Sequence, residues 1–305
     1  MIGALPGLDL TVGVVASASP AADPEAVRTG VAFLEDAGLR VVQAPNVGRG
    51  RGYLAGSPQQ RASDLQWAFE EPGIDVVLEL RGGYGCGHVI PLLDFDRVAA
   101  NPKPFVGMSD ITLLHLALQR LAGLTTLWGP MLHQLHKASD YSRSRLLDAL
   151  GGRGYSVDPA PGQPELRTLV GGAARGRLVG GTTTLLASSL GTPYEVDTAG
   201  CLVLLEDVDI EPYNVDRTLT QLEQAGKLEA AAGFVVGEHA DVAPGPAFGN
   251  DGLSLMEVLE EKLAPLGVPT VYGFPLGHGA HLATVPLGVE AELDADEQRL
   301  TLPGR

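Results

Sequence analysis

Three residues of types that cooperate in acyl transfer occur in the order nucleophile, acid, base: Ser109, Glu206 and His278. Each follows the end of an apolar run, where a strand would pass into a loop. A histidine can take the proton of a serine hydroxyl, while a carboxylate fixes the imidazole tautomer and stabilises the imidazolium. The three residues could therefore form a catalytic triad. Because Ser109 lies in the first half of the chain, we expect such a site in a cleft between two domains.

The serine lies in the stretch Gly107-Met108-Ser109-Asp110, between the short apolar run 104–108 and a helical pattern. A sharp turn there would hold Ser109 beside a helix N-terminus, where amide N–H groups and the helix dipole stabilise developing negative charge. The same pattern is also typical of simple helix capping, in which Ser or Asp accepts a backbone N–H. Both interpretations stay open on this stretch alone.

The proposed acid and base also have simpler interpretations. Glu206 and Asp207 close an apolar strand, which is a costly place for carboxylates unless they have partners. A surface loop is the alternative. His278 lies between two glycines just after a strand, so its ring could be presented freely or could simply be solvated.

The remaining histidines and the cysteines suggest weaker sites. His133 and His136 form an H-x-x-H pair with no nearby third ligand, which favours a structural role, so we expect no metal. A cysteine hydrolase could use Cys86 with His88, but the cysteine lacks a glycine two residues before it. His115, within the apolar helix after the serine, is expected in the core. A non-catalytic two-domain binding protein is a further alternative.

The pattern of apolar and polar residues in the first half of the chain predicts the strands and helices that could position these residues. Apolar runs predict strands at 10–16, 39–43, 74–80, 104–108 and 125–128. Helices are expected from Asp23-Pro24 to about Ala37, over Pro58–Glu70 after a capping box, and from Ser139-Asp140 to about Leu150. Strands that are apolar throughout and alternate with helices indicate a parallel sheet covered on both faces. In such sheets, functional loops follow the carboxyl ends of the strands.

The second half has a more mixed pattern. We expect domains at 1–152 and 169–305, joined by a Gly/Pro-rich linker at 153–168. Strands are predicted at 167–170, 175–179, 201–205, 233–237 and 270–274, with helices at 182–190, 212–225 and 253–263. The alternating tail, VEAELDADEQRLTL, predicts a terminal hairpin.

Composition sets the class of protein. The chain has 305 residues, 45% of them hydrophobic, which suffices for a large core and two domains. A net charge of −16, with no cluster of Lys and Arg, argues against nucleic acid. No stretch is long and apolar enough to span a membrane, and the N-terminus lacks the basic region of a signal peptide. With two cysteines, we expect a cytoplasmic protein without a disulfide framework.

Four ordered motifs resemble the LD-carboxypeptidase family of serine peptidases. They are RGGYG with PLLDFDRVAANPKPFVGMSDITLLHLAL, then GGTTTLLASSLGTPYEVD, LLEDVDIEPYNVDRTLTQLEQAGKL and GFPLGHGAHLATVPLGVEAELDAD. The resemblance covers nearly the whole chain. It implies an α/β protein, with an N-terminal parallel-sheet sandwich laid out as in class I amidotransferases and a smaller, β-rich C-terminal domain. It also implies a homodimer that needs no metal or other cofactor.

The family's triad falls on Ser109, Glu206 and His278. The resemblance places the oxyanion hole at the backbone N–H of Asp110 and of the Gly82-Gly83 turn. The implied activity is release of terminal D-alanine from cytoplasmic murein tetrapeptides, which makes a small peptide the expected partner. Candidates for contact with the substrate are Arg81, Tyr84 and Arg217, although a structural role for either arginine stays open.

Two stretches depart from the family pattern and leave the substrate open. Thr182 stands where the family commonly has Asn, and Asp209-Ile210-Glu211 stand where it commonly has Gly-Glu-Pro. A sister branch hydrolyses microcin C and related acyl-adenylate mimics, with an aromatic residue stacked on the nucleobase. Neither Trp67 nor Trp128 lies in the second domain near Glu206, which favours the murein substrate.

Overall fold

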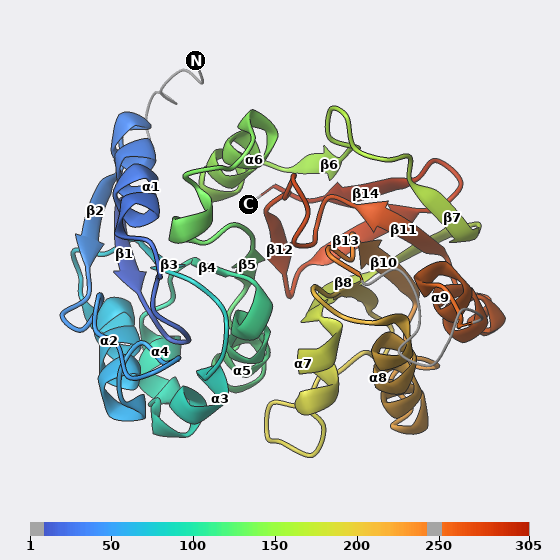
Figure 1. Cartoon of the computed structure of the whole chain (residues 1–305), viewed down its shortest axis with the longest axis horizontal. Coiled ribbons are helices and arrows are strands. Elements are labelled where there is room, and N and C mark those ends of the chain that lie inside the picture. The colour runs from blue at the N-terminus through green and yellow to red at the C-terminus, as the bar shows by residue number, and fades with distance from the viewer. Residues whose placement is uncertain (1–8, 243–251, 305) are drawn as a thin grey trace. The chain divides into compact units, whose positions relative to one another are not determined.

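The computed structural model describes residues 9–242 and 252–304. Residues 1–8 lie outside the described part of the chain. They begin the segment that we predicted not to be a signal peptide. The chain divides into two compact units. One comprises Met1–Gly151 with Thr284–Pro286, and the other comprises Gly152–Ala283 with Leu287–Arg305. In Figure 1, the first unit is coloured blue to green apart from residues 284–286, which are red, and the second unit is coloured green to red.

The first unit is built on a six-stranded sheet with the order β12-β5-β4-β3-β1-β2. The strand pairs from β2 to β5 are all parallel, as the continuous apolar runs predicted. Because β3 lies beside β4, the loops that carry Gly82 and Ser109 leave the same edge of the sheet. The strands are β1 (Thr11–Val15), β2 (Arg40–Gln43), β3 (Val76–Glu79), β4 (Phe105–Gly107), β5 (Thr126–Trp128) and β12 (Val285–Leu287).

Helices of the first unit begin where the capping residues predicted. The α2 helix (Pro58–Glu70) has the full capping box between Ser57 and Gln60. Asp23 caps α1 through the backbone N–H of Glu25. The other helices are α1 (Pro24–Asp36), α3 (Cys86–Val89), α4 (Phe95–Ala100), α5 (Thr112–Ala122) and α6 (Asp140–Leu150). Short α3 and α4 were not predicted.

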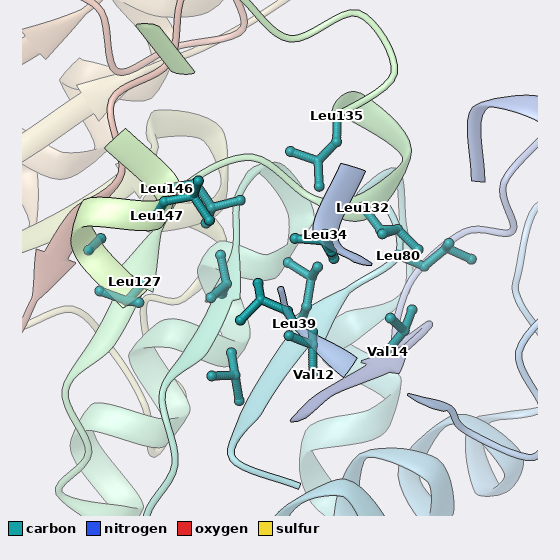
Figure 2. Packing of buried hydrophobic residues seen from close by; sticks show 14 of the residues in the cluster. Val12, Val14, Leu34, Leu39, Leu80, Leu127, Leu132, Leu135, Leu146 and Leu147 are labelled. Atoms are coloured by element: carbon teal, nitrogen blue, oxygen red, sulfur yellow. The ribbon is translucent and has the colours of Figure 1, made fainter. Parts of the chain in front are cut away.

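One core cluster of this unit joins the sheet to α1 and α6. Val12 and Val14 of β1 pack in it with Leu34 of α1 and Leu146 and Leu147 of α6, as Figure 2 shows. All five are at most 2% exposed. Burial of each such side chain contributes about 1.5–3 kcal/mol, so this cluster stabilises the sheet from which the loops with Gly82 and Ser109 leave.

The second unit is built on an eight-stranded mixed sheet with the order β6-β14-β13-β8-β9-β10-β11-β7. Its centre, from β8 to β11, is parallel, and antiparallel strands lie on both sides of it. The strands are β6 (Tyr155–Val157), β7 (Arg167–Val170), β8 (Ala173–Thr182), β9 (Leu202–Glu206), β10 (Gly233–Gly237), β11 (Thr270–Phe274), β13 (Glu290–Asp294) and β14 (Arg299–Leu302). Its helices are α7 (Thr183–Ser188), α8 (Pro212–Gln224) and α9 (Leu255–Leu263).

Two short strands differ from the expected organisation. Residues 153–168, expected to be a linker, include β6, which pairs with β14 inside the second sheet. The start of this stretch, and its end where β7 begins at Arg167, therefore belong to the second sheet. Strand β12 comes late in the chain yet pairs with β5 in the first sheet. Three-residue strands give little local pattern, and their pairing depends on distant residues.

The lengths and hydrophobicity of the helices show whether any of them could span a membrane. In the described part of the chain, none of the helices is both long enough and apolar enough to cross a bilayer.

Candidate active site

Ser109 lies at a tight turn between β4 and the helix that follows. Its φ of 64° puts it in the left-handed region, which costs a non-glycine residue about 1–3 kcal/mol. A single turn of 3-10 helix, Ser109–Ile111, leads directly into α5. Thr112 Oγ1 donates to the Ser109 carbonyl at 2.7 Å and braces the turn. Ser109 is partly exposed while Met108 and Asp110 on either side are buried, so this strained turn presents the serine.

The backbone at Gly82 lies against this serine. A Cβ atom at Gly82 would stand 2.8 Å from Ser109 Cβ and 3.1 Å from its Oγ, so only glycine fits. Gly83 has a φ of 109°, which also requires glycine. Ser19 holds the loop by a bond from its N–H to the Gly82 carbonyl (3.2 Å) and by accepting the N–H of Tyr84 (3.2 Å). The RGGYG loop thus brings backbone polar groups beside the serine hydroxyl.

Buried ionisable side chains lie beneath these two loops. Glu79, at the end of β3, is fully buried, and its Oε2 accepts the N–H of Ser17 at 3.0 Å. Burial raises the pKa of Glu79 to about 8, despite the opposing effect of Ser17. Arg61 is 1% exposed and donates from Nη1 to the carbonyls of Ser17 and Gly85. These side chains connect the loop after β1 to the RGGYG loop.

Asp110 links the serine turn to the same loop. Its Oδ2 accepts the backbone N–H of Cys86 at 2.8 Å, and burial raises the pKa of this carboxyl. Sequence reasoning gave Asp110 a backbone role in the oxyanion hole and left a capping role of its side chain open, and it did not single out Glu79 or Arg61. The available signal was a charged residue inside an apolar run, the Glu79 of VVLEL.

In the second unit, the structure brings His278 and Glu206 together. His278 Nδ1 lies 2.8 Å from Glu206 Oε2. A carboxylate accepts, so Nδ1 carries the proton, which leaves Nε2 as the basic nitrogen when the ring is neutral. Burial lowers the pKa of His278, but the hydrogen bond and charge of Glu206, with Asp207 and Asp241 nearby, outweigh burial and raise it overall.

Threonines hold Glu206 from its other side. The carboxylate is fully buried, and Thr182 Oγ1 donates to its Oε1 at 2.5 Å. Thr183 Oγ1 donates to the Glu206 backbone carbonyl at 3.1 Å. Sequence reasoning noted Thr182 as a departure from the family and did not predict this bond. Thr182 and His278 thus bind the two carboxylate oxygens of Glu206, so the orientation of the His278 ring is set by a chain of hydrogen bonds.

The surface-loop interpretation of Glu206 and Asp207 is wrong, since both are at most 5% exposed. Asp207 Oδ2 accepts from the backbone N–H and the hydroxyl of Thr184, at 3.1 and 2.6 Å. Both carboxylates at the end of β9 therefore have partners, which offsets the cost of burying them.

Candidate substrate contacts have the following places. Arg81 Nη1 donates to the Pro20 carbonyl at 3.2 Å. Tyr84 is 53% exposed, with its ring beside those of Tyr53 and His88. In the second unit, Arg217 is exposed on α8 and lies over the ring of Tyr213. Tyr84 is thus exposed, while Arg81 donates to the backbone and Arg217 donates from Nη1 to Asn214 Oδ1 at 3.0 Å.

Other histidines and Cys86 have structural surroundings. His115 is fully buried, and both His133 and His136 bind backbone carbonyls through Nδ1. Burial lowers the pKa of His115 to about 4, as suits a core residue. Burial raises the pKa of Cys86 well above the ordinary thiol value, so a thiolate nucleophile is disfavoured. Within the described residues, no group of three or more His, Cys, Asp or Glu could hold a metal ion.

Comparison with known proteins identifies the family to which this chain belongs. The model of the LD-carboxypeptidase N-terminal domain matches residues 12–129, and that of the LD-carboxypeptidase C-terminal domain matches 175–293. A probable murein peptide carboxypeptidase of Bacillus subtilis is 39% identical over 297 residues, which are 94% of this chain and 90% of the relative.

Two solved structures have the same fold. Muramoyltetrapeptide carboxypeptidase from Oxalobacter formigenes superposes with a TM-score of 0.83 at 25% identity, covering 96% of this chain and 99% of the other. The microcin C7 self-immunity protein MccF, in its wild-type apo state, gives 0.89 at 23% identity, covering 100% and 99%, and shows likeness of fold alone. Two matched domain models and a close relative along nearly the whole length establish that this chain belongs to the LD-carboxypeptidase family.

Proposed function

We propose that this protein is a serine LD-carboxypeptidase that releases terminal D-alanine from murein tetrapeptides. The observation that carries the proposal is the His278–Glu206 pair, whose 2.8 Å hydrogen bond leaves Nε2 as the basic nitrogen. Such a pair serves a nucleophile, and Ser109 is the serine at a strained turn before a helix. The names of the Bacillus subtilis relative and the Oxalobacter formigenes structure support murein peptides as the substrate class.

In this mechanism, His278 Nε2 takes the hydroxyl proton as Ser109 Oγ attacks the carbonyl of the L,D-peptide bond. Negative charge on the carbonyl oxygen is stabilised by the backbone N–H of Asp110 and one from the Gly82-Gly83 turn. The imidazolium, stabilised by Glu206, then protonates the nitrogen of D-alanine, and the C–N bond breaks. Water, activated by His278, hydrolyses the acyl-enzyme and releases the shortened peptide.

Further parts of the proposal concern recognition and setting. We assign contacts with the substrate to Arg81, Tyr84 and Arg217, because the peptide carries carboxylates that need cations and hydrogen-bond donors. Arg81 supplies its remaining N–H groups, while Tyr84 and Arg217 are exposed. The protein acts as a homodimer in the cytoplasm, where it meets peptides recovered from the cell wall.

The test is hydrolysis of L-Ala-γ-D-Glu-meso-diaminopimelate-D-Ala, with D-alanine release followed by mass spectrometry. Wild type should release D-alanine, and Ser109→Ala should lose about 10⁴-fold or more of that rate. The Cys86→Ala variant is the control and should keep full activity.

No release by wild type would overturn the murein assignment. Hydrolysis of an aminoacyl-sulfamoyl nucleotide by the same preparation would then favour the activity of the microcin C branch. Release that persists in Ser109→Ala would remove the serine from its role.

A further inference from the structure

A cavity of about 300 Å³ lies within the second unit, beside the residues that follow His278. Glu238 and His239, just after β10, line it together with Tyr272 of β11. Gly279 and Ala280 continue the wall from the proposed catalytic base. Because β9, β10 and β11 are parallel neighbours, this cavity and the His278–Glu206 pair lie at the same edge of the sheet.

Glu238 lines this cavity, and hydrogen bonds satisfy its carboxylate only in part. Its Oε2 is buried, and none of the described residues donates a hydrogen bond to it. Burial raises the pKa of Glu238, and the side-chain amide of Gln163 offsets this only in part. A buried carboxylate without sufficient donors is costly, and a cation that brings N–H donors would relieve the cost.

His239 adds a second acceptor. It is 8% exposed, and its Nδ1 lies 3.2 Å from the Gly237 carbonyl. A carbonyl can only accept, so Nδ1 carries the proton and the neutral ring has an acceptor at Nε2. Burial lowers the pKa of His239, which keeps the ring neutral. No described residue bonds to Nε2, so its lone pair is open to a ligand.

The whole lining has one electrostatic character. Exposed Glu165 also contributes to the wall, and no lysine or arginine is among the described residues that line it. Two carboxylates, an imidazole acceptor and the Tyr272 ring favour a compact cation with several N–H donors. A primary ammonium, with one charge and three donors, has this chemistry.

We propose that this cavity binds an ammonium group of the substrate. This ammonium ends the side chain of the residue that supplies the scissile carbonyl. The inference rests on the proposed function, since it places the cavity by its nearness to His278. The lysine side chain ends in such an ammonium, and the diaminopimelate side chain ends in an ammonium with a carboxylate on the same carbon, whereas an aliphatic side chain of the same length has neither.

Close packing between Gly279 and Glu238 places the cavity next to the loop that carries His278. A Cβ atom at Gly279 would collide with the Glu238 carboxylate, so the glycine lets the loop after His278 lie directly on that side chain. Glu238 therefore packs against Gly279, the residue that follows the base. An ammonium held by Glu238 would locate the adjoining carbonyl relative to His278.

The experiment compares two tetrapeptides, L-Ala-γ-D-Glu-X-D-Ala, in which X is L-lysine or L-norleucine. Wild type should prefer the lysine peptide by about tenfold to a hundredfold in kcat/KM, as expected for a hydrogen-bonded charge pair. Glu238→Gln keeps the shape and should remove this preference, mainly by raising KM for the lysine peptide. Glu229→Gln, on an exposed turn of the same unit, is the matched control and should keep the preference.

Two results would overturn the inference while leaving the enzyme assignment intact. One is equal use of both peptides by wild type. The other is a Glu238→Gln variant that loses kcat equally on both, since that would show a purely structural role under the His278 loop.

A binding measurement keeps the cavity testable if neither peptide is cleaved, and release of D-alanine from the diaminopimelate tetrapeptide decides the proposed function separately. Calorimetry with the tripeptides lacking D-alanine should then show tighter binding of the lysine form to wild type and no difference with Glu238→Gln. Equal binding of both forms to wild type would overturn the inference.

Discussion

The two halves of the proposed site are held in different ways. In the first unit, the position of Ser109 depends on backbone geometry, namely a left-handed turn and a glycine pressed against it. In the second unit, Glu206 and His278 depend on side-chain hydrogen bonds that begin at Thr182. The difference shows that a nucleophile can be fixed by the shape of the chain, whereas an acid–base pair needs directed polar partners.

Burial of ionisable side chains follows the same division. Beneath the serine turn, Glu79 and Arg61 bond to the backbone of neighbouring loops and act as struts. At the end of β9, by contrast, Glu206 uses its carboxylate oxygens for Thr182 and His278. Substitutions in the two halves should therefore fail differently, in geometry in the first and in proton transfer in the second.

The largest effect among these tests is expected from Glu206→Gln. It removes the charge that stabilises the His278 imidazolium, and kcat/KM should fall about 10³-fold or more. The pKa of His278 should fall as well, because the hydrogen bond and charge of Glu206 raise it. We would measure kcat/KM against pH, together with thermal melting to confirm folding. Unchanged kinetics would break the comparison by removing the acid from the second half.

Gly82→Ala tests the backbone half. The new Cβ would stand 2.8 Å from Ser109 Cβ, so the loop or the serine must move, and the N–H groups near the hydroxyl move with it. We expect about a hundredfold to a thousandfold loss in kcat, as for loss of an oxyanion donor. Gly50→Ala, where a Cβ meets nothing within 4 Å, is the matched control. A fully active Gly82→Ala would show that the close approach has no catalytic meaning.

Thr182→Val should have a smaller effect, about tenfold in kcat/KM. It leaves Glu206 Oε1 without the bond from Thr182 and so loosens the carboxylate that orients His278. Thr182→Ser keeps the hydroxyl and should restore most of the activity. If both variants lose activity equally, shape rather than the hydrogen bond matters at this position.

The wild-type pH profile sharpens the acid–base half further. His278 acts as a base only when neutral, and its pKa lies above the ordinary 6.5, so kcat/KM should fall as pH drops through that raised value. For stability the sign is opposite. The pair stabilises the fold fully below pH 6.5, and this contribution is lost as pH rises through the folded pKa. An acid limb of kcat/KM with its midpoint below pH 6.5 would contradict the raised pKa of His278.

Glu79→Gln should change catalysis least and stability in a pH-dependent way. With its pKa raised to about 8, Glu79 favours the fold while protonated, and this contribution is lost as pH rises from 4.5 through about 8. The neutral amide avoids that loss. The melting temperature of the variant, relative to wild type, should therefore increase between pH 6 and pH 9. A gap independent of pH would mean that Glu79 is already ionised in the folded protein.

Local signals made most of the fold predictable. The capping box at Ser57 and the turn at Gly107–Asp110 are encoded within a few residues, so the α2 helix and the serine turn follow from sequence. The ends of apolar runs located Glu206 and His278, although 72 residues separate them. The role of Thr182 could not be predicted, because its bond to Glu206 arises only when β8 pairs with β9. Arg61 and Glu238 were missed for the same reason, since their surroundings come from distant loops.

Strand β12 has a consequence for the order in which the protein is made. The N-terminal sheet includes a strand from residues 285–287, so a ribosome must translate nearly the whole chain before that sheet is complete. Until then, the edge of β5 lacks its partner, and an unpaired edge is a template for aggregation. A nascent chain stalled before Val285 should therefore depend on chaperones more than the finished protein does.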